Sequence, residues 1–382
     1  MSELFAHNST TVASDGAGPG ALTSVKIQFV RIYLCLILGL LIPPSLVMGI
    51  NYFNDSFAIF HDDRDLIGPA NLNFVRMKYL IESGAQHKVV LLGSSRTNVL
   101  DIGSHISESA YTISIPGGYT DHHLRNLNAL IERGIVPDMV LLGLGEAAIQ
   151  VPEEGDAKRR NYNRLHPIAE GTNPLLYYWD YLTYIPSLAD LLHFRNRLSR
   201  TLRGSNGISE HSLRILHTGR VKCIQCEDRA LQRSDDEHIA ALAKTIRGYR
   251  PKGIEVSGAI DSVQMIVDLA DAHGISLFIF IDPIYQVKYL SDDVPNWMKF
   301  KRELGQITPF LDFSNFNSTF ATAKNFVDPI HYNQETGARI MSDITSALAG
   351  RVNDIELGTW VTAENVDGYL QQQQGLYLSL QQ

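Results

Sequence analysis

The sequence predicts an α/β protein: a parallel β-sheet flanked by helices, with a helical insertion and one N-terminal transmembrane helix. Two observations predict this class. Continuous apolar runs such as VVLLG (89–93) and MVLLG (139–143) alternate with helix-like segments, and such runs suit parallel strands that are covered on both faces. In addition, residues 32–50 contain no charged side chain, and this length is close to the ~20 residues that a helix needs to cross a bilayer.

The uncharged run predicts a membrane anchor over residues 32–52. A cleavable signal peptide and a buried core helix are the alternatives. The long leader before the run and the lack of a small-x-small site after it favour an uncleaved anchor, and Pro43 and Pro44 are better tolerated in a membrane span than inside a soluble helix. Residues 1–31, which begin with small and polar residues, are expected to form a disordered cytoplasmic leader.

Charge asymmetry predicts the orientation of this anchor. Lys26 and Arg31 precede the run, and four aspartates follow it: Asp55, Asp62, Asp63 and Asp65. The positive-inside rule then places the N-terminus in the cytoplasm and the rest of the chain outside it. In a Gram-negative bacterium the anchor lies in the inner membrane and the body in the periplasm. The formal net charge of −8 argues against nucleic acid as a partner, because phosphate backbones bind basic surfaces.

After the anchor, the pattern predicts a connector over residues 53–86 and the first part of the α/β domain over residues 87–150. The connector ends in an amphipathic helix, NLNFVRMKYLIES. The α/β part is predicted as strand, short helix, strand, helix and strand, with the strands at HKVVLLG, AYTISIPGG and PDMVLLGLG. Helices that alternate with strands in this way indicate parallel pairing.

The pattern changes over residues 151–250, where charged and aromatic residues dominate, so we expect a helical insertion. Five aromatic residues stand out there: Tyr177, Tyr178, Trp179, Tyr181 and Tyr184. In one interpretation they line a sugar-binding cleft or contact a membrane surface beside nearby arginines. In the other they pack one side of a helix on the core. The α/β pattern resumes over residues 251–350, with a strand at ISLFIFIDP. Residues 351–382 are expected as a glutamine-rich tail, with docking of its leucines and tyrosines as the alternative.

Cys223 and Cys226 form a C-I-Q-C motif inside the insertion. In an oxidising compartment such a pair predicts a local disulfide. Half of a zinc site, completed by His211 or His217, is an alternative. A thioredoxin-like redox centre is less favoured, because no strand leads into the motif and no helix pattern begins at it.

Candidate site residues follow three of the predicted strands, in the segments Gly93-Ser94-Ser95-Arg96, Ile115-Pro116-Gly117-Gly118 and Gly143-Leu144-Gly145-Glu146. Open α/β sheets bind ligands at the carboxyl ends of their strands, which favours these segments. The third segment continues as G-L-G-E-A-A and matches the dinucleotide fingerprint, but Pro152 and a charged loop follow where a long helix is required. Nicotinamide or flavin binding is therefore not expected.

A fourth segment, DPIH at residues 328–331, precedes the last predicted helix. A carboxylate three residues before a histidine can accept the Nδ1–H of the imidazole, which fixes the tautomer and leaves Nε2 free to accept a proton. A helix cap at Asp328 is the alternative. Beside a serine at a strand end, Asp328 and His331 predict a nucleophile, a base and an orienting carboxylate. Such a set supplies all the groups it needs, so no metal and no organic cofactor is expected.

The motifs GSSR, PGG and DPIHY together resemble those of the SGNH/GDSL hydrolase superfamily. More narrowly, they are similar to its membrane-anchored cell-envelope branches related to alginate acetylation and lipoteichoic acid D-alanylation proteins. The resemblance covers residues 85–150 and 255–350, and it implies an SGNH-like (flavodoxin-like) sheet. By position it implies that Ser95 is the nucleophile, His331 the base and Asp328 the orienting carboxylate.

The resemblance also implies an oxyanion hole formed by the backbone N–H of Ser95 and that of Gly118 or Gly117. The third block of the family supplies an asparagine amide to the same oxygen, whereas this chain has G-L-G-E there. Loss of one oxyanion donor lowers rates by ~10²–10³-fold. Three further residues are candidates for substrate binding: Arg96, Glu146 and Tyr332. Arg96 is expected to meet either an anionic group of the substrate or a neighbouring carboxylate.

These observations predict a membrane-anchored, extracytoplasmic serine esterase or O-acyltransferase that removes or transfers an acetyl group on a surface polysaccharide or other envelope glycan. A membrane acyltransferase is the candidate protein partner. Two other functions are compatible with the sequence. A catalytically silent domain that binds glycan or acts as a scaffold is favoured by the missing asparagine, and a lipid esterase is favoured by the membrane span.

Overall fold

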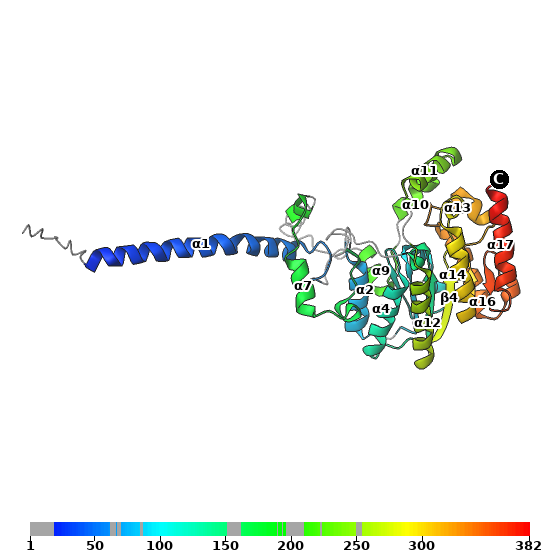
Figure 1. Cartoon of the computed structure of the whole chain (residues 1–382), viewed down its shortest axis with the longest axis horizontal. Coiled ribbons are helices and arrows are strands. Elements are labelled where there is room, and N and C mark those ends of the chain that lie inside the picture. Colours follow the sequence, from blue (N-terminus) through cyan, green and yellow to red (C-terminus); the bar gives the residue numbers. More distant parts are fainter. Residues whose placement is uncertain are drawn as a thin grey trace, which may run out of the picture.

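The computed structural model describes residues 19–61, 66, 70–84, 87–150, 162–188, 190–192, 194–195, 210–221, 224–249 and 254–382. Within them the chain forms an α/β body from which one long N-terminal helix projects (Figure 1). Residues 1–18 of the predicted leader and Cys223 of the predicted disulfide lie outside the described residues.

A six-stranded sheet forms the centre of the body, in the order β2-β1-β3-β4-β5-β6. Its strands are β1 (Val89–Ser94), β2 (Ala110–Ile115), β3 (Met139–Leu144), β4 (Ser276–Ile281), β5 (Phe310–Asp312) and β6 (Thr359–Val361). The strand pairs among β1 to β5 are parallel, whereas β6 is antiparallel to β5. The sheet is therefore mixed, and the predicted parallel pairing holds for all strands except this edge strand.

Successive side chains of a strand point to opposite faces of the sheet. On β1, Val90 and Leu92 point into one apolar cluster, and Val89 and Leu91 point into the other. Helices cover both faces. This explains why the parallel strands are apolar at successive positions rather than at every second one.

The helices form one layer on each face of the sheet. One face is covered by α2 (Leu72–Ser83), α4 (Thr120–Glu132), α12 (Val256–Ala272), α14 (Val294–Ile307) and α17 (Val366–Leu380). The other is covered by α3 (Ile102–His105), α11 (Asp235–Gly248), α15 (Ser318–Ala321) and α16 (Gln334–Leu348). The other described elements are α1 (Pro19–Asn54), α6 (Pro167–Glu170), α7 (Pro174–Leu182), α9 (Glu210–Thr218), α10 (Ile224–Leu231), α13 (Gln286–Leu290) and the 3₁₀ turns η1 (Ser95–Val99), η2 (Glu146–Ile149), η3 (Ala323–Asn325) and η4 (Val352–Asp354).

The strand order reverses at β1, because β2 pairs with one side of β1 and β3 with the other. Such a reversal opens a crevice at the carboxyl ends of the flanking strands. The segments that follow β1, β2 and β3 therefore meet at one edge of the sheet. They are the three strand-end segments that the sequence singles out.

Helix α1 is long and apolar enough to span a membrane. Within its segment Ile27–Asn54, the most apolar 18-residue window has a mean hydropathy of 2.2 and contains no buried residue. The helix contains Pro43 and Pro44, and it begins at Pro19, well before the predicted span. By length and composition, α1 supports the predicted anchor.

The described part of the predicted insertion is helical, as expected. Tyr177 and Tyr181 of α7 are buried in a cluster with Phe57 and Phe74. These two tyrosines therefore pack on the core and do not line a sugar-binding cleft. Trp179 of the same helix is half exposed.

Residues 351–382, expected as a tail, are part of the body. β6 forms the edge strand of the sheet, and α17 packs its apolar side chains against α14. The buried Gln373 accepts a hydrogen bond from the backbone N–H of Phe316 at 3.0 Å. A glutamine that suggests a solvated tail in the sequence is thus a buried hydrogen-bond acceptor in a packed helix.

Candidate active site

Ser95 lies where β1 passes directly into the 3₁₀ turn η1. Gly93 permits this tight turn, because a Cβ there would lie 2.3 Å from Thr97 Cγ2. Thr97 Oγ1 donates to the carbonyl of Ser94 at 2.8 Å, and Asn98 Nδ2 donates to the carbonyl of Ser95 at 3.1 Å. These bonds hold the Ser95 hydroxyl at the carboxyl edge of the sheet.

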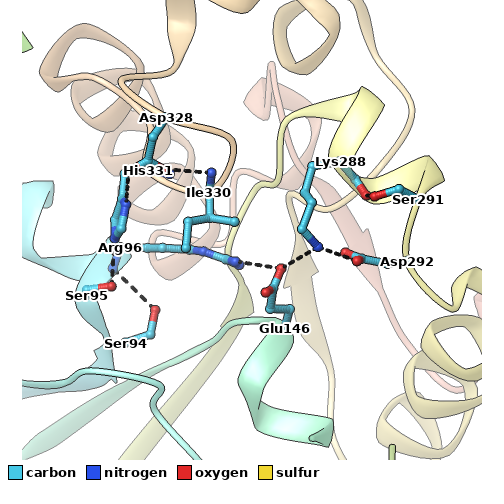
Figure 2. A network of polar contacts seen from close by, with 10 residues as sticks. All are labelled: Ser94, Ser95, Arg96, Glu146, Lys288, Ser291, Asp292, Asp328, Ile330 and His331. Carbon is cyan, nitrogen blue, oxygen red and sulfur yellow. Dashed lines mark hydrogen bonds and ion pairs between the residues drawn. The ribbon is translucent and has the colours of Figure 1, made fainter. Parts of the chain in front are cut away.

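The three predicted catalytic side chains meet at this edge (Figure 2). Ser95 Oγ lies 2.7 Å from His331 Nε2, although the two residues are 236 positions apart in the sequence. His331 Nδ1 lies 2.7 Å from Asp328 Oδ2. The other oxygen of Asp328 accepts the backbone N–H groups of Ile330 and His331, both at 2.9 Å. The D-x-x-H turn therefore orients its own carboxylate toward the imidazole.

The Asp328 carboxyl is held in its ionised form. Burial opposes the charge, but the His331 imidazole and the two backbone N–H donors outweigh burial and lower the pKa of Asp328 below its usual value. An ionised Asp328 accepts the Nδ1–H of a neutral His331, which leaves Nε2 free to accept the proton of Ser95. The three side chains thus have the geometry of a nucleophile, a base and an orienting carboxylate, while their catalytic role stays a prediction.

The turn after β2 packs against the serine segment. Gly117 and Gly118 have φ angles of 90° and 51°, in the region that favours glycine. A Cβ on Gly118 would also lie 2.9 Å from Ser94 Cα, so the close approach of the two backbones requires glycine there. The turn therefore packs on Ser94, the neighbour of Ser95, and an oxyanion N–H from this turn stays a prediction.

A chain of ion pairs extends from the serine segment along a neighbouring cleft (Figure 2). Arg96 Nη2 lies 3.2 Å from Glu146 Oε2, and Lys288 Nζ lies 3.4 Å from the same oxygen. Lys288 also pairs with Asp292. Arg96 and Lys288 are both buried. Of the two contacts expected for Arg96, the structure thus contains the neighbouring carboxylate.

The charges of this network perturb its carboxyl groups in opposite directions. Burial disfavours ionised Glu146, but Arg96 and Lys288 outweigh it and lower the pKa of Glu146. Burial and the proximity of Glu146 raise the pKa of Asp292 to about 6. An ionised carboxylate has no hydrogen to donate. Glu146 therefore does not replace the oxyanion-binding amide that the resemblance implies at this strand end.

A cleft of about 550 Å³ opens beside the Ser95 hydroxyl. Its lining residues include Ser95, Arg96, Gly117, Glu146, Tyr249, Lys288 and Asp292. The volume lies within the ~300–1,000 Å³ typical of small-ligand sites. Two of the three predicted substrate-binding residues, Arg96 and Glu146, are thus beside the predicted nucleophile.

The third, Tyr332, is placed differently. Its side chain is fully buried, and it is not among the residues that line the cleft. Its hydroxyl donates to Asp282 Oδ1 at 3.3 Å. Asp282 directly follows β4, and complete burial raises its pKa to about 6. Tyr332 therefore packs inside the protein and does not contact a ligand in this cleft.

The sequence does not signal the residues that support the serine turn from within the body. Arg76 of α2 is fully buried and burial lowers its pKa to about 10. Its Nε donates to the Gly219 carbonyl at 2.7 Å, and its Nη1 donates to the Ser114 carbonyl. Its Nη2 donates at 3.2 Å to Asn98 Oδ1, on the side chain that binds the Ser95 carbonyl. In the sequence, Arg76 is one charged residue of an amphipathic helix, a pattern typical of a solvated side chain.

Two further predictions concern metal ions and the cysteine pair. Among the described residues, no group of three or more histidine, cysteine, aspartate or glutamate side chains is arranged to hold a metal ion. Cys223 and the side chain of Cys226 lie outside the described residues. The local disulfide and the lack of a cofactor both stay predictions.

No protein-family model matches the chain, and no curated protein matches it at a significant level of similarity. The fold and the site define an α/β protein with a mixed, mostly parallel six-stranded sheet and one N-terminal helix that is apolar enough to cross a membrane. A Ser–His–Asp arrangement lies at the carboxyl edge of its sheet. Its function is inferred from this arrangement.

Proposed function

We propose that the protein is a membrane-anchored, extracytoplasmic serine esterase or O-acyltransferase of the SGNH type, acting on acetyl esters of an envelope polysaccharide or other glycan. One observation carries this proposal: Ser95 Oγ lies 2.7 Å from His331 Nε2, and Asp328 Oδ2 lies 2.7 Å from the other imidazole nitrogen. A serine hydroxyl becomes nucleophilic when a base in this position accepts its proton.

The proposed reaction uses these contacts in order. Ser95 Oγ attacks the ester carbonyl carbon while His331 Nε2 takes the hydroxyl proton, and the backbone N–H groups of Ser95 and of Gly118 or Gly117 would bind the resulting oxyanion. The C–O bond to the glycan breaks, and His331 returns the proton to the departing sugar hydroxyl. Water then attacks the acyl-serine in hydrolysis, or the hydroxyl of a second glycan attacks it in transfer. Ser95 regains its proton through His331.

The lining of the cleft supports a polar, sugar-like substrate. Lys288 Nζ lies over the ring of the partly exposed Tyr249, 4.9 Å from its centroid, and Glu146, Asp292 and Asn296 line the same cleft. An aromatic face next to hydrogen-bond donors and acceptors fits a sugar ring, which has apolar faces and polar edges. If a membrane acyltransferase is the partner, the acyl ester that it supplies would take the place of the first glycan ester, and the glycan hydroxyl would then attack the acyl-serine.

Covalent labelling tests the proposed nucleophile. The full-length protein should gain one adduct from a fluorophosphonate, located at Ser95 by peptide mass mapping, and should release acetate from p-nitrophenyl acetate and from an O-acetylated polysaccharide. Ser95→Ala should gain no adduct. Ser94→Ala is the matched control, because Ser94 Oγ accepts from the Arg96 backbone N–H at 3.3 Å. It should be labelled like the wild type.

Two results would count against this proposal. Labelling of Ser95→Ala at the wild-type rate would remove Ser95 as the nucleophile. A wild-type protein that is unreactive toward the fluorophosphonate and toward both esters would remove the enzyme function. Faster hydrolysis of long-chain than of acetyl esters would instead identify a lipid esterase.

A catalytically silent glycan-binding or scaffold protein is the second candidate function. Glu146 favours it, because this carboxylate stands where the resemblance implies an asparagine amide and is paired with Arg96 and Lys288. A wild-type protein that binds O-acetylated glycan, takes up no fluorophosphonate and releases no acetate would identify this function.

We further propose that α1 lies in a bacterial inner membrane and that the body lies in the periplasm. The charge asymmetry around the apolar segment supports this orientation. Alkaline phosphatase fused after residue 60 should then be active, and a reporter that requires the cytoplasm should be inactive at the same point. Fusions after residue 24 are the matched control and should give the opposite pattern. An inactive phosphatase and an active cytoplasmic reporter at residue 60 would reverse the orientation.

A further inference from the structure

Exposed apolar side chains gather on the body where α1 joins it. Helix α7 contacts α1 and runs crosswise to it (Figure 1). The exposed apolar residues on α7 and on the segment that follows it include Leu175, Leu176, Trp179, Ile185, Leu188 and Leu192, and we call them the α7 apolar surface. Leu175 and Ile185 are 80% and 82% exposed. Single exposed leucines are ordinary, but a group of this kind indicates an interaction site.

The α7 apolar surface faces away from the body. On the opposite side of α7, Tyr177 and Tyr181 are buried against Phe57. Successive residues of an α-helix are ~100° apart around its axis, so Leu175 and Trp179 project on the side opposite to the buried tyrosines. Figure 1 shows that α7 lies crosswise to α1, at the end of the body from which α1 projects.

Hydrogen bonds from two asparagines join the end of α7 and the segment after it to the last turn of α1. Asn51 Nδ2 donates to the carbonyls of Leu182 and Tyr184 at 2.7 and 2.6 Å. Asn54 Nδ2 donates to the carbonyl of Asp190 at 3.1 Å. Both asparagines are buried, which strengthens these bonds by excluding water. The α7 apolar surface therefore keeps one position relative to the axis of α1.

We propose that the α7 apolar surface lies on the lipid bilayer that α1 spans, at the boundary between headgroups and acyl chains. The exposed surface of α1 identifies lipid as the partner. Residues 32–46 of α1 are almost all exposed, and their apolar surface continues onto α7 where α1 joins the body. The same lipid that surrounds α1 would cover the surface beside it, and tryptophan is enriched at this boundary. The contact would hold the body in one orientation and the Ser95 hydroxyl at one height above the membrane.

Tryptophan fluorescence of the full-length chain in lipid vesicles tests this contact. The chain has 3 tryptophans: Trp179 on the surface in question, Trp297 in the core and Trp360 on β6. In phosphatidylcholine vesicles whose acyl chains carry bromine near the headgroup, the wild type should lose part of the fluorescence that it shows in unbrominated vesicles. Trp179→Phe should abolish this quenching, whereas Trp360→Phe should retain it.

A variant with two added charges on the α7 apolar surface provides a second test. Leu175→Glu combined with Ile185→Glu should abolish most of the quenching of Trp179, because carboxylates are unfavourable in the acyl region. Anchoring by α1 and thermal unfolding should be unchanged, since both positions are exposed. Leu378→Glu is the matched control: this leucine is 51% exposed on α17, at the end of the body far from α1 (Figure 1). It should leave the quenching intact.

Quenching that persists in Trp179→Phe, or that is undiminished in the double glutamate variant, would overturn the proposal. If a second copy of the chain covers the surface instead, Trp179 should not be quenched in brominated vesicles. Chemical cross-linking of the chain in these vesicles should then give a dimer. That result would overturn it as well.

Discussion

Replacing Ser95 or His331 with alanine should each remove nearly all ester hydrolysis, and replacing both should lose little more than replacing either. The Ser95 hydroxyl is nucleophilic only while His331 Nε2, 2.7 Å away, accepts its proton. The effects of the two substitutions on kcat are therefore not additive, and each single variant should lose ~10⁴–10⁶-fold in kcat. The measurement is kcat and kcat/KM for p-nitrophenyl acetate with the purified full-length variants.

Asp328→Asn should lose ~10⁴-fold in kcat, by analogy with well-studied triads. The asparagine can keep one oxygen toward the Ile330 and His331 backbone N–H groups, but its NH₂ then donates to His331 Nδ1. The imidazole must carry its proton on Nε2 and can no longer accept one from Ser95. Full activity in Asp328→Asn would show that this residue only caps the turn, and full activity in Ser95→Ala would show that Ser95 is not the nucleophile.

The strands that could be predicted are the long ones. β1 to β4 are apolar runs covered on both faces, and local sequence is sufficient to recognise them. β5 and β6 have 3 residues each, which is too short for a periodic signal. Their pairing depends on α14 and α17 packing beside them, and packing of this kind is a tertiary effect.

The candidate catalytic residues could be predicted for a related reason. Ser95 and the DPIH turn are local motifs whose chemistry is visible in a few residues. The ion-pair network is not local: Lys288 is 142 positions from Glu146, and it reaches that carboxylate because the strand before it, β4, pairs with β3. Nor does the sequence show that Tyr332 is buried on Asp282, since burial depends on the whole fold.

Amino-acid composition predicts the structure least well at the C-terminal end of the chain. There a buried ion pair helps to hold α17 to the core. Lys301 Nζ on α14 lies 2.8 Å from Asp312 Oδ2 on β5, and their side chains are 1% and 0% exposed. The Tyr369 hydroxyl of α17 donates to the same Asp312 oxygen at 2.7 Å. The other oxygen of Asp312 accepts from Ser314 N at 2.8 Å. One carboxylate therefore joins α14, β5 and α17.

Asp312→Leu should destabilise the body by about 3–5 kcal/mol, because it leaves the Lys301 ammonium buried without a counter-ion. The measurement is the free energy of unfolding in denaturant, followed by circular dichroism at pH 7. The double variant Asp312→Leu/Lys301→Met is the matched control, since it removes both charges. It should recover much of the lost stability, because an apolar pair of similar volume often replaces a buried ion pair without penalty.

The dependence of stability on pH separates this ion pair from simple packing. Burial acts to lower the pKa of Lys301, but Asp312 outweighs burial, so the pKa lies above the ordinary value of 10.5. The stability that a raised lysine pKa contributes is complete below the unfolded value and is lost as the pH rises through the folded value. The wild type should therefore lose unfolding free energy above pH 10.5, and the double variant should lack this component. If Asp312→Leu is as stable as the wild type at pH 7, or if the double variant shows the same alkaline loss, packing rather than the ion pair holds α17 to the sheet.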